Sequence, residues 1–414
     1  MKRRAYLTLA ASTSLCLAGC AELRSGDSNG DNGDDDGAPG STSSSDSAGD
    51  HPDIAGTDDD FEDLDVWNVS GGDLSADPDR SVVGSQSARL EIPSGEGSAV
   101  LTKAFDEPRD LSAVAPGVAA ASDELIVPWI RLLDVDGNSI AYRRGISGDL
   151  PLMRYNFGVD STSSAFDVGA VTDVQLQVWT AENESRTVWF DDFHFTPRPE
   201  TGKVMIQFDD THVTDYTKAL PILEEYGYPA VTFINSDYVG RDAGGVPRMS
   251  TEQLHELHDA GWCIANHTDT HPHLSQLSRE EQEAEILDGK EWLIDQGFEE
   301  DAEYFAYPFG DYNATTIELV EKHHTLGFAG GRPVQGYTTN TELVSRIGEP
   351  DVERVERELE RTVEMGGITK MFYHRLEDEH LEAFETLVET VHKYESQGDL
   401  EVILPQDLEE RYLF

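Results

Sequence analysis

The residue types best suited to hydrolytic chemistry follow short apolar segments of this chain. Two adjacent carboxylates, Asp209 and Asp210, come directly after the run 204–208. His267 and His271 stand four residues apart, and His374 follows a later apolar run. Two imidazoles at this spacing can reach one cation, and either carboxylate can complete the ligand set. The other carboxylate then stays free to accept a proton from water, and His374 can protonate a leaving group.

These side chains can meet only if the intervening elements bring them together. After residue 200, strand-like runs alternate with helical patterns, among them a strand over 368–373 and helices over 216–226 and 352–365. Repeated β–α units of this length predict a parallel sheet or a barrel. In such barrels the carboxyl ends of the strands meet at one mouth, which is where these polar residues fall. The sequence therefore predicts a catalytic β/α barrel over residues 200–414.

Each of these motifs is weak when taken alone. Paired acidic residues are common in this chain, and the His-x-x-x-His pair lacks the glutamate of the His-Glu-x-x-His protease helix. Two alternatives to carbohydrate hydrolysis therefore stay open. One is a catalytically impaired surface carbohydrate-binding protein, and the other is an amidohydrolase acting on a non-sugar amide.

Residues 203–410 resemble the polysaccharide deacetylase domain, also called the NodB-homology domain or carbohydrate esterase family 4. The resemblance is carried by Gln207-Phe208-Asp209-Asp210, His267-Thr268-Asp269-Thr270-His271-Pro272, Tyr307-Pro308-Phe309-Gly310 and the segment from Ile368 to His374. It implies a distorted (β/α)7 barrel that removes acetyl groups from N- or O-acetylated polysaccharide or oligosaccharide. It also implies a divalent metal, with Zn²⁺ as the default and Co²⁺ or Ni²⁺ as fitting substitutes.

The resemblance also assigns roles to individual residues. The implied roles are general base for Asp209, metal ligands for Asp210, His267 and His271, general acid for His374, and substrate groove or oxyanion contact for Tyr307, Pro308, Phe309 and Arg346. Three departures from the family pattern stand out. Thr211 occupies a position that is usually Gly. Ala306 occupies a position that often holds an Arg bracing the base, and Arg346 is the candidate that replaces this Arg. The acidic residue that usually supports the acid histidine is not evident.

The composition limits the possible partners and the environment. The chain has 414 residues with 81 acidic and 30 basic side chains, a formal net charge of −51. No basic patch is available for nucleic acid. Acidic residues run through periodic segments rather than a tail, and only eight basic residues are Lys. This pattern resembles folded proteins of salt-loving archaea, in which high salt screens the self-repulsion. The sequence is silent on the oligomeric state.

The first 56 residues are predicted to be a targeting segment and a tether. Residues 1–20 combine a basic start, an apolar run and Leu17-Ala18-Gly19-Cys20, which resembles a lipobox with Cys20 as the lipidated residue. Arg3-Arg4 resembles a twin-arginine export signal. Residues 21–56 are an acidic Ser/Gly-rich stretch with little apolar content, which predicts disorder. We therefore expect export to the outer face of a haloarchaeal membrane, with contact through the lipid only.

Residues 57–197 predict a β-sandwich. Short alternating runs recur between Gly- and Asp-rich turns, without a helix-length amphipathic segment. The pattern resembles the jelly-roll carbohydrate-binding modules, so sugar binding is a possible role. Exposed aromatic rings would serve it, but each of Trp67, Trp129, Trp179 and Trp189 is more readily explained as a core residue.

Overall fold

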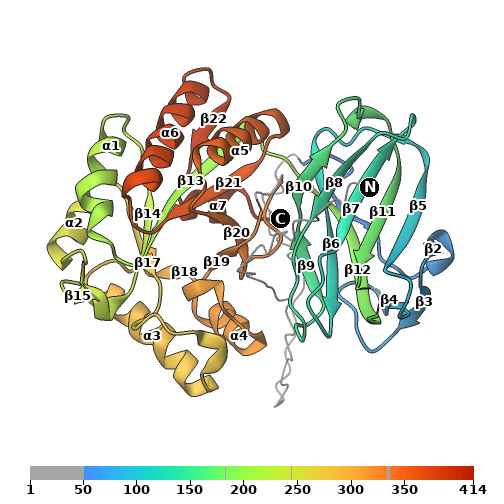
Figure 1. Cartoon of the computed structure of the whole chain (residues 1–414), viewed down its shortest axis with the longest axis horizontal. Coiled ribbons are helices and arrows are strands. Elements are labelled where there is room, and N and C mark those ends of the chain that lie inside the picture. Colours follow the sequence, from blue (N-terminus) through green and yellow to red (C-terminus); the bar gives the residue numbers. More distant parts are fainter. Residues whose placement is uncertain (1–50, 182, 244, 333–335) are drawn as a thin grey trace, which may run out of the picture.

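The computed structural model describes residues 51–181, 183–243, 245–332 and 336–414, and two regions lie side by side in Figure 1. The predicted signal peptide, Cys20 and most of the predicted tether lie outside the described residues. The first strand, β1, begins at Gly56, the last residue of the predicted tether. Within the described ranges, none of the helices combines the length and apolar composition that crossing a membrane requires.

The C-terminal region contains a closed barrel of parallel strands. Its order is β13-β14-β17-β18-β19-β20-β21, and β13 pairs with both β14 and β21, which closes the ring. The strands are β13 (Gly202–Asp209), β14 (Val231–Ile234), β17 (Cys263–Asn266), β18 (Tyr304–Ala306), β19 (Leu326–Gly330), β20 (Val344–Gly348) and β21 (Ile368–Tyr373). A further strand, β22 (Leu400–Val402), pairs with the start of β13. The predicted seven-stranded barrel is therefore confirmed.

Helices surround this barrel (Figure 1). They are α1 (Leu220–Glu224), α2 (Thr251–Asp259), α3 (Arg279–Asp295), α4 (Ala314–His323), α5 (Val352–Met365), α6 (Asp378–Glu395) and α7 (Pro405–Arg411). Local signals set several of their ends. The side chain of Asp351 accepts a hydrogen bond from the Arg354 N–H at the start of α5, and Gly366 ends that helix in the left-handed conformation at φ 63°. A small hairpin, β15 (Asp242–Ala243) with β16 (Val246–Pro247), lies before α2.

Alternate residues of β13 belong to different packed layers. Val204, Ile206 and Phe208 pack in a cluster with apolar residues of the surrounding helices. Met205 packs instead with apolar residues of the other barrel strands. Because side chains alternate along a strand, Asp209 lies on the same side of β13 as Met205, the interior side. The strand therefore aims this carboxylate into the barrel at its carboxyl end.

Residues 56–197 form two six-stranded, mainly antiparallel sheets. The β12 sheet contains β3 (Asp73–Asp77), β4 (Ser87–Ile92), β12 (Arg186–Pro197), β6 (Val114–Ser122) and β9 (Met153–Asn156), with β1 (Gly56–Asp59) beside β12. The β11 sheet contains β10 (Gly158–Thr162), β8 (Ser139–Arg143), β7 (Trp129–Asp134), β11 (Val171–Trp179), β5 (Ser98–Arg109) and β2 (Asn68–Ser70). Residues of both sheets share one buried apolar cluster. Whether this region binds sugar stays a prediction.

Polar contacts join the antiparallel sheets to the barrel. The Asn156 side chain donates to the Tyr337 carbonyl at 2.8 Å and accepts from the Thr339 N–H at 3.0 Å. Buried Arg144 bonds to the Ser345 hydroxyl at the start of β20 and donates to the Leu343 carbonyl at 3.3 Å. These bonds fix the sheets against the barrel wall.

Candidate active site

The paired aspartates stand where β13 ends in a strained turn. Asp209 is the last residue of β13, and the next two residues have positive φ, 72° at Asp210 and 59° at Thr211. This region is costly for residues other than glycine, and most of all for a β-branched one such as Thr211. Tertiary contacts hold it: the Thr211 hydroxyl accepts from the Asn235 N–H at 2.8 Å, and its carbonyl accepts from the Met249 N–H at 2.9 Å. A threonine therefore replaces the usual glycine at a position that still needs the glycine conformation.

The structure brings Asp210, His267 and His271 together. One ligand atom from each lies within 4.8 Å of the others, which is close enough to hold one metal ion. The Asp210 Oδ1 is 3.1 Å from the Nε2 of His271 and 3.6 Å from that of His267. Burial alone would raise the pKa of Asp210, but the hydrogen bond from His271 and the nearby imidazoles lower it far below its usual range. The carboxylate therefore stays ionised, as binding a cation requires.

His267 is oriented for metal binding by its second ring nitrogen. Its Nδ1–H donates to the Ala306 carbonyl at 2.7 Å, which leaves Nε2 as the acceptor. That Nε2 atom is buried without a hydrogen-bond partner. Burial is the main cause that lowers the pKa of His267 to about 4, and the nearby charges act in both directions. The ring is therefore neutral at pH 7. A neutral imidazole with an orphaned acceptor fits a divalent ion.

Asp209 is held by a buried two-point contact with Arg346 of β20. Both nitrogen–oxygen distances are 2.7 Å, and both side chains are 3 % exposed. Burial would raise the pKa of the Asp209 carboxyl, but the Arg346 charge outweighs it, so the pKa lies below its usual range. The structure thus places Arg346 as a brace for Asp209, the compensating role that the sequence suggested. Because Arg346 is buried there, its implied contact with substrate is not supported.

His374 follows β21 and is oriented by Glu349. Its Nδ1–H donates to the Glu349 Oε1 at 3.1 Å, and the imidazole is 37 % exposed. Burial would lower the pKa of His374, but this hydrogen bond and the carboxylates of Asp209 and Asp210 raise it above its ordinary value. The ring can therefore carry a proton near neutral pH. A protonated imidazole on a carboxylate support is suited to general acid catalysis.

The predicted groove residues divide into two groups. Tyr307 is completely buried, and its hydroxyl donates to the Glu342 carbonyl at 2.7 Å. Pro308 is buried as well. Neither side chain is accessible in this structure, so their predicted place in a groove wall gains no support from it. Phe309, at φ 55°, is 53 % exposed and lies beside His271 with 4.4 Å between ring centroids. It is the member of this motif that can meet a substrate.

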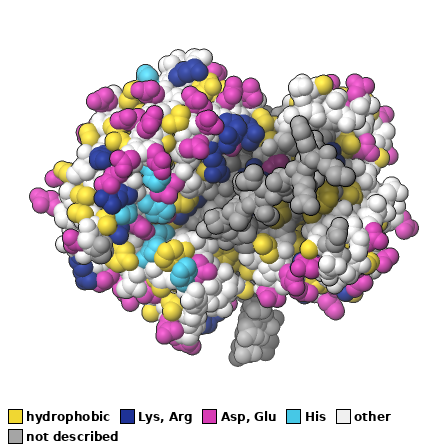
Figure 2. Space-filling model, viewed as in Figure 1, with side chains coloured by type: hydrophobic (Ala, Val, Ile, Leu, Met, Phe, Trp, Pro, Cys, Tyr) yellow, Lys and Arg dark blue, Asp and Glu magenta, His cyan; other side chains and the backbone are white. Residues whose placement is uncertain are grey.

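Several residues at the site carried no spacing signal in the sequence. Glu349 is one glutamate among many, and only the fold places it beside His374. Arg248 bonds to the Asp210 carbonyl and donates to the Nε2 of His212 at 3.1 Å. On the barrel side of Figure 2, His side chains gather with Lys and Arg side chains beside them. Arg248 therefore brings a positive charge next to Asp210.

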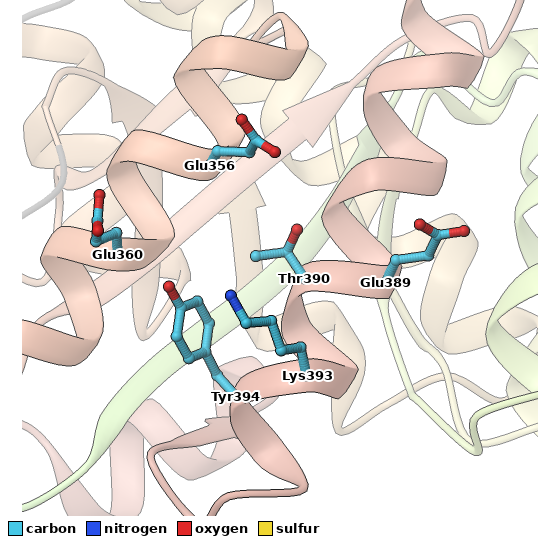
Figure 3. A pocket seen from close by; sticks show the side chains of 6 residues that line it. All are labelled: Glu356, Glu360, Glu389, Thr390, Lys393 and Tyr394. Atoms are coloured by element: carbon cyan, nitrogen blue, oxygen red, sulfur yellow. The ribbon is translucent and has the colours of Figure 1, made fainter.

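A separate pocket lies between α5 and α6 (Figure 3). It is lined by Glu356, Glu360, Glu389, Thr390, Lys393 and Tyr394. The lining includes neither the aspartate pair nor any of the histidines discussed above. This pocket is therefore distinct from the candidate active site.

Part of the barrel matches a known protein family. Residues 196–326 match the family model described as polysaccharide deacetylase. The matched segment includes the aspartate pair and both candidate histidine ligands, and it ends before Arg346, Glu349 and His374. The match shows that residues 196–326 are similar to polysaccharide deacetylases.

Two curated relatives and two solved structures resemble the chain. YxkH of Bacillus subtilis (strain 168), whose name assigns it provisionally to the polysaccharide deacetylases, is 33% identical over 125 residues, 30% of this chain and 43% of that protein. The poly-beta-1,6-N-acetyl-D-glucosamine N-deacetylase of Staphylococcus aureus (strain MRSA252) is 30% identical over 128 residues, 29% of this chain and 44% of that protein. The chain thus spans less than half the length of these relatives.

The solved structures are both acetate complexes. One is a family 4 carbohydrate esterase from Streptomyces lividans, with 20% identity and a TM-score of 0.34 over 49% of this chain and 92% of the other. The second is the Streptococcus pyogenes deacetylase PplD, with 26% identity and a TM-score of 0.30 over 34% of this chain and 62% of the other.

Proposed function

We propose that this protein is a metal-dependent hydrolase that removes acetyl groups from N- or O-acetylated polysaccharide. The proposal depends most on one arrangement: a possible metal site of Asp210, His267 and His271 next to an arginine-braced Asp209, at the mouth of a barrel that matches polysaccharide deacetylases. The name of the staphylococcal relative makes a polymer of β-1,6-linked N-acetylglucosamine the first substrate to test.

Asp210, His267 and His271 would hold the metal. Two imidazoles and one carboxylate suit Zn²⁺ first, and Co²⁺ or Ni²⁺ would accept the same donors. When bound, such an ion supplies Lewis-acid polarisation of the acetyl carbonyl and makes water more acidic. The remaining proton transfers fall to side chains of this chain.

Asp209 and His374 would act as base and acid. Arg346 keeps Asp209 ionised, so its carboxylate can accept a proton from the attacking water. Glu349 helps to keep His374 protonated, so its ring can give a proton to the departing amine of an N-acetyl sugar or the alkoxide of an O-acetyl sugar. Water adds to the acetyl carbon, the bond from that carbon to nitrogen or oxygen breaks, and acetate and the deacetylated glycan leave.

The decisive test joins metal content to acetate release. The full-length protein in high salt should contain one equivalent of a divalent metal by mass spectrometry and release acetate from the β-1,6-linked polymer or another acetylated glycan. His267→Ala should lose both properties. Asp209→Asn should keep the metal and lose acetate release, whereas the surface variant Glu318→Gln should match wild type. Undiminished acetate release by a metal-free protein would refute the mechanism.

The same proposal places the enzyme at the cell surface. It is supported only by the residue pattern of positions 1–20, where Cys20 follows a lipobox-like segment. Expression of the full chain in a haloarchaeal host should leave wild type with the membrane fraction and release Cys20→Ser into the medium. Equal membrane association of both proteins would exclude the lipid anchor.

A further inference from the structure

The four tryptophans that we expected in the core do not all lie there. Trp67 and Trp189 are buried at 4% and 5% exposure, but Trp179 is 58% exposed and Trp129 is partly exposed. Along β11, Val174, Leu176 and Val178 are buried while Gln175, Gln177 and Trp179 are not. Trp179 therefore belongs to the side of the β11 sheet that faces away from the core.

The strand register places the second indole on the same outward side. Trp129 of β7 is the partner of Gln177 on β11, and Trp179 is two residues further along β11. Diagonal neighbours of this kind are about 7–8 Å apart. Arg143 of β8 pairs with Trp129 and holds its guanidinium 5.3 Å from the indole centroid. Two aromatic faces thus stand close together on one sheet surface.

Acidic residues are sparse around these two rings, although Asp160 of β10 pairs with Arg143 at 2.7 Å and Asp173 lies on the outward side of β11. The segments 98–102, 129–131, 141–143 and 175–179 lie side by side in β5, β7, β8 and β11 and contain no Asp or Glu. By contrast, 81 of the 414 residues of the chain are acidic. The β12 sheet carries exposed Asp73 and Glu91 opposite each other on β3 and β4. The low number of acidic residues is therefore a local feature of this part of the β11 sheet and is not shared by every strand in this region.

We propose that this surface, the outward side of β5, β7, β8 and β11, binds a polysaccharide chain. The apolar faces of sugar rings would stack on Trp129 and Trp179. Beside the rings, Gln177 and Gln175 offer amides to sugar hydroxyls, and Arg131 contacts Gln175 at 3.4 Å and Ser139 at 3.2 Å. Among the described residues, Arg131 bonds to the uncharged partners Gln175 and Ser139, whereas Arg143 pairs with Asp160 at 2.7 Å, so the surface suits a neutral or anionic glycan.

A second copy of this chain suits the same surface poorly. Each copy carries a formal net charge of −51, so association of two copies would bring like charges together. Choosing a glycan as the occupant rests on the proposed function, because the barrel of the same chain would act on acetylated polymer. A polymer held on the β11 sheet would stay near the barrel through repeated deacetylation events.

The experiment compares polymer binding with catalysis in the full-length protein. Probes are insoluble chitin for co-sedimentation, and soluble glycol chitin and hyaluronan for tryptophan-fluorescence titration, all in high NaCl. Wild type should bind at least one probe. Trp179→Ala should bind about fivefold more weakly, because one stacked ring is worth roughly 1 kcal/mol, and Trp129→Ala/Trp179→Ala should not bind measurably. Val135→Ala, which alters an equally exposed apolar residue at 58%, should bind like wild type.

Three results would overturn the proposal. Wild type could fail to bind every probe, the double variant could bind like wild type, or the double variant could lose only a dimer seen by light scattering. Acetate release from short acetylated oligosaccharides should be unchanged in Val135→Ala, and matching circular dichroism would show that the variants fold. Binding without acetate release by any protein would refute the proposed enzyme function and leave this surface assignment standing.

Discussion

Replacing Arg346 by Met should strongly destabilise the protein. The guanidinium makes two contacts of 2.7 Å to Asp209, and both side chains are 3 % exposed. Removing one partner of a buried ion pair leaves an uncompensated charge and costs about 3–5 kcal/mol. We expect a loss of this size in the free energy of unfolding of Arg346→Met, measured by urea denaturation in high salt.

A surface pair supplies the matched control. Arg279 also contacts Glu318 through two 2.7 Å distances, but these side chains are 43 % and 60 % exposed. Exposed pairs contribute about 0–1 kcal/mol, so Arg279→Met should lose no more than that. The double variant Arg346→Met/Asp209→Asn should recover at least half of the loss, because the buried charge is then gone.

The pH dependence of the loss tests the same reasoning. Without Arg346, burial raises the pKa of Asp209 above its unfolded value of about 3.9. The buried, ionised carboxylate therefore lowers the free energy of unfolding of Arg346→Met only above that pH. In wild type the pKa is lowered, and the stability that Asp209 contributes disappears as pH falls through the folded pKa. Both effects reduce the difference in the free energy of unfolding between wild type and Arg346→Met as the pH falls. If Arg346→Met lost less than about 1 kcal/mol in the free energy of unfolding, or if its difference from wild type did not depend on pH, the role of burial would be refuted.

Three further expectations follow from individual contacts. Glu349→Gln removes the carboxylate that raises the pKa of His374, so the alkaline limb of the kcat profile should move to lower pH while KM changes little; an unmoved limb would contradict the assignment. Thr211→Ala leaves the buried Asn235 N–H without its 2.8 Å partner and should cost about 1–3 kcal/mol in urea unfolding, whereas an unchanged midpoint would show that the hydroxyl does not support the turn. Burial raises the pKa of the Cys263 thiol well above its usual range, so a thiol reagent such as DTNB should label it only in urea, and rapid native labelling would contradict its burial.

Local signals in the sequence predicted many barrel elements accurately. The expected helix 352–365 and strand 368–373 match α5 and β21, because the cap at Asp351 and the left-handed Gly366 are encoded within a few residues. The expected helix over 216–226 instead begins as a π-helical turn at Asp215–Ala219 and continues as the short α1. The helix α7 was not predicted, since its seven residues begin with Pro405 and contain little apolar periodicity.

The ligand candidates were also readable, because spacing and position after strands identify them. Asp210, His267 and His271 each follow or end an apolar run, and parallel strands in a barrel bring such ends together. Glu349 could not be identified in this way. Its position is ordinary among 81 acidic residues, and its role depends on where β20 ends relative to His374.

The sequence by itself determined the strand–helix alternation and which side chains follow the strand ends, because both depend on residues close together along the chain. Only the tertiary structure decided that Tyr307 is covered, that Trp179 is exposed and that Arg346 holds Asp209. Burial and electrostatics depend on segments far apart in sequence that come into contact, and the last two residues are 137 positions apart. Since the same contacts set the charge state of a buried group, its chemistry is fixed only when the barrel closes.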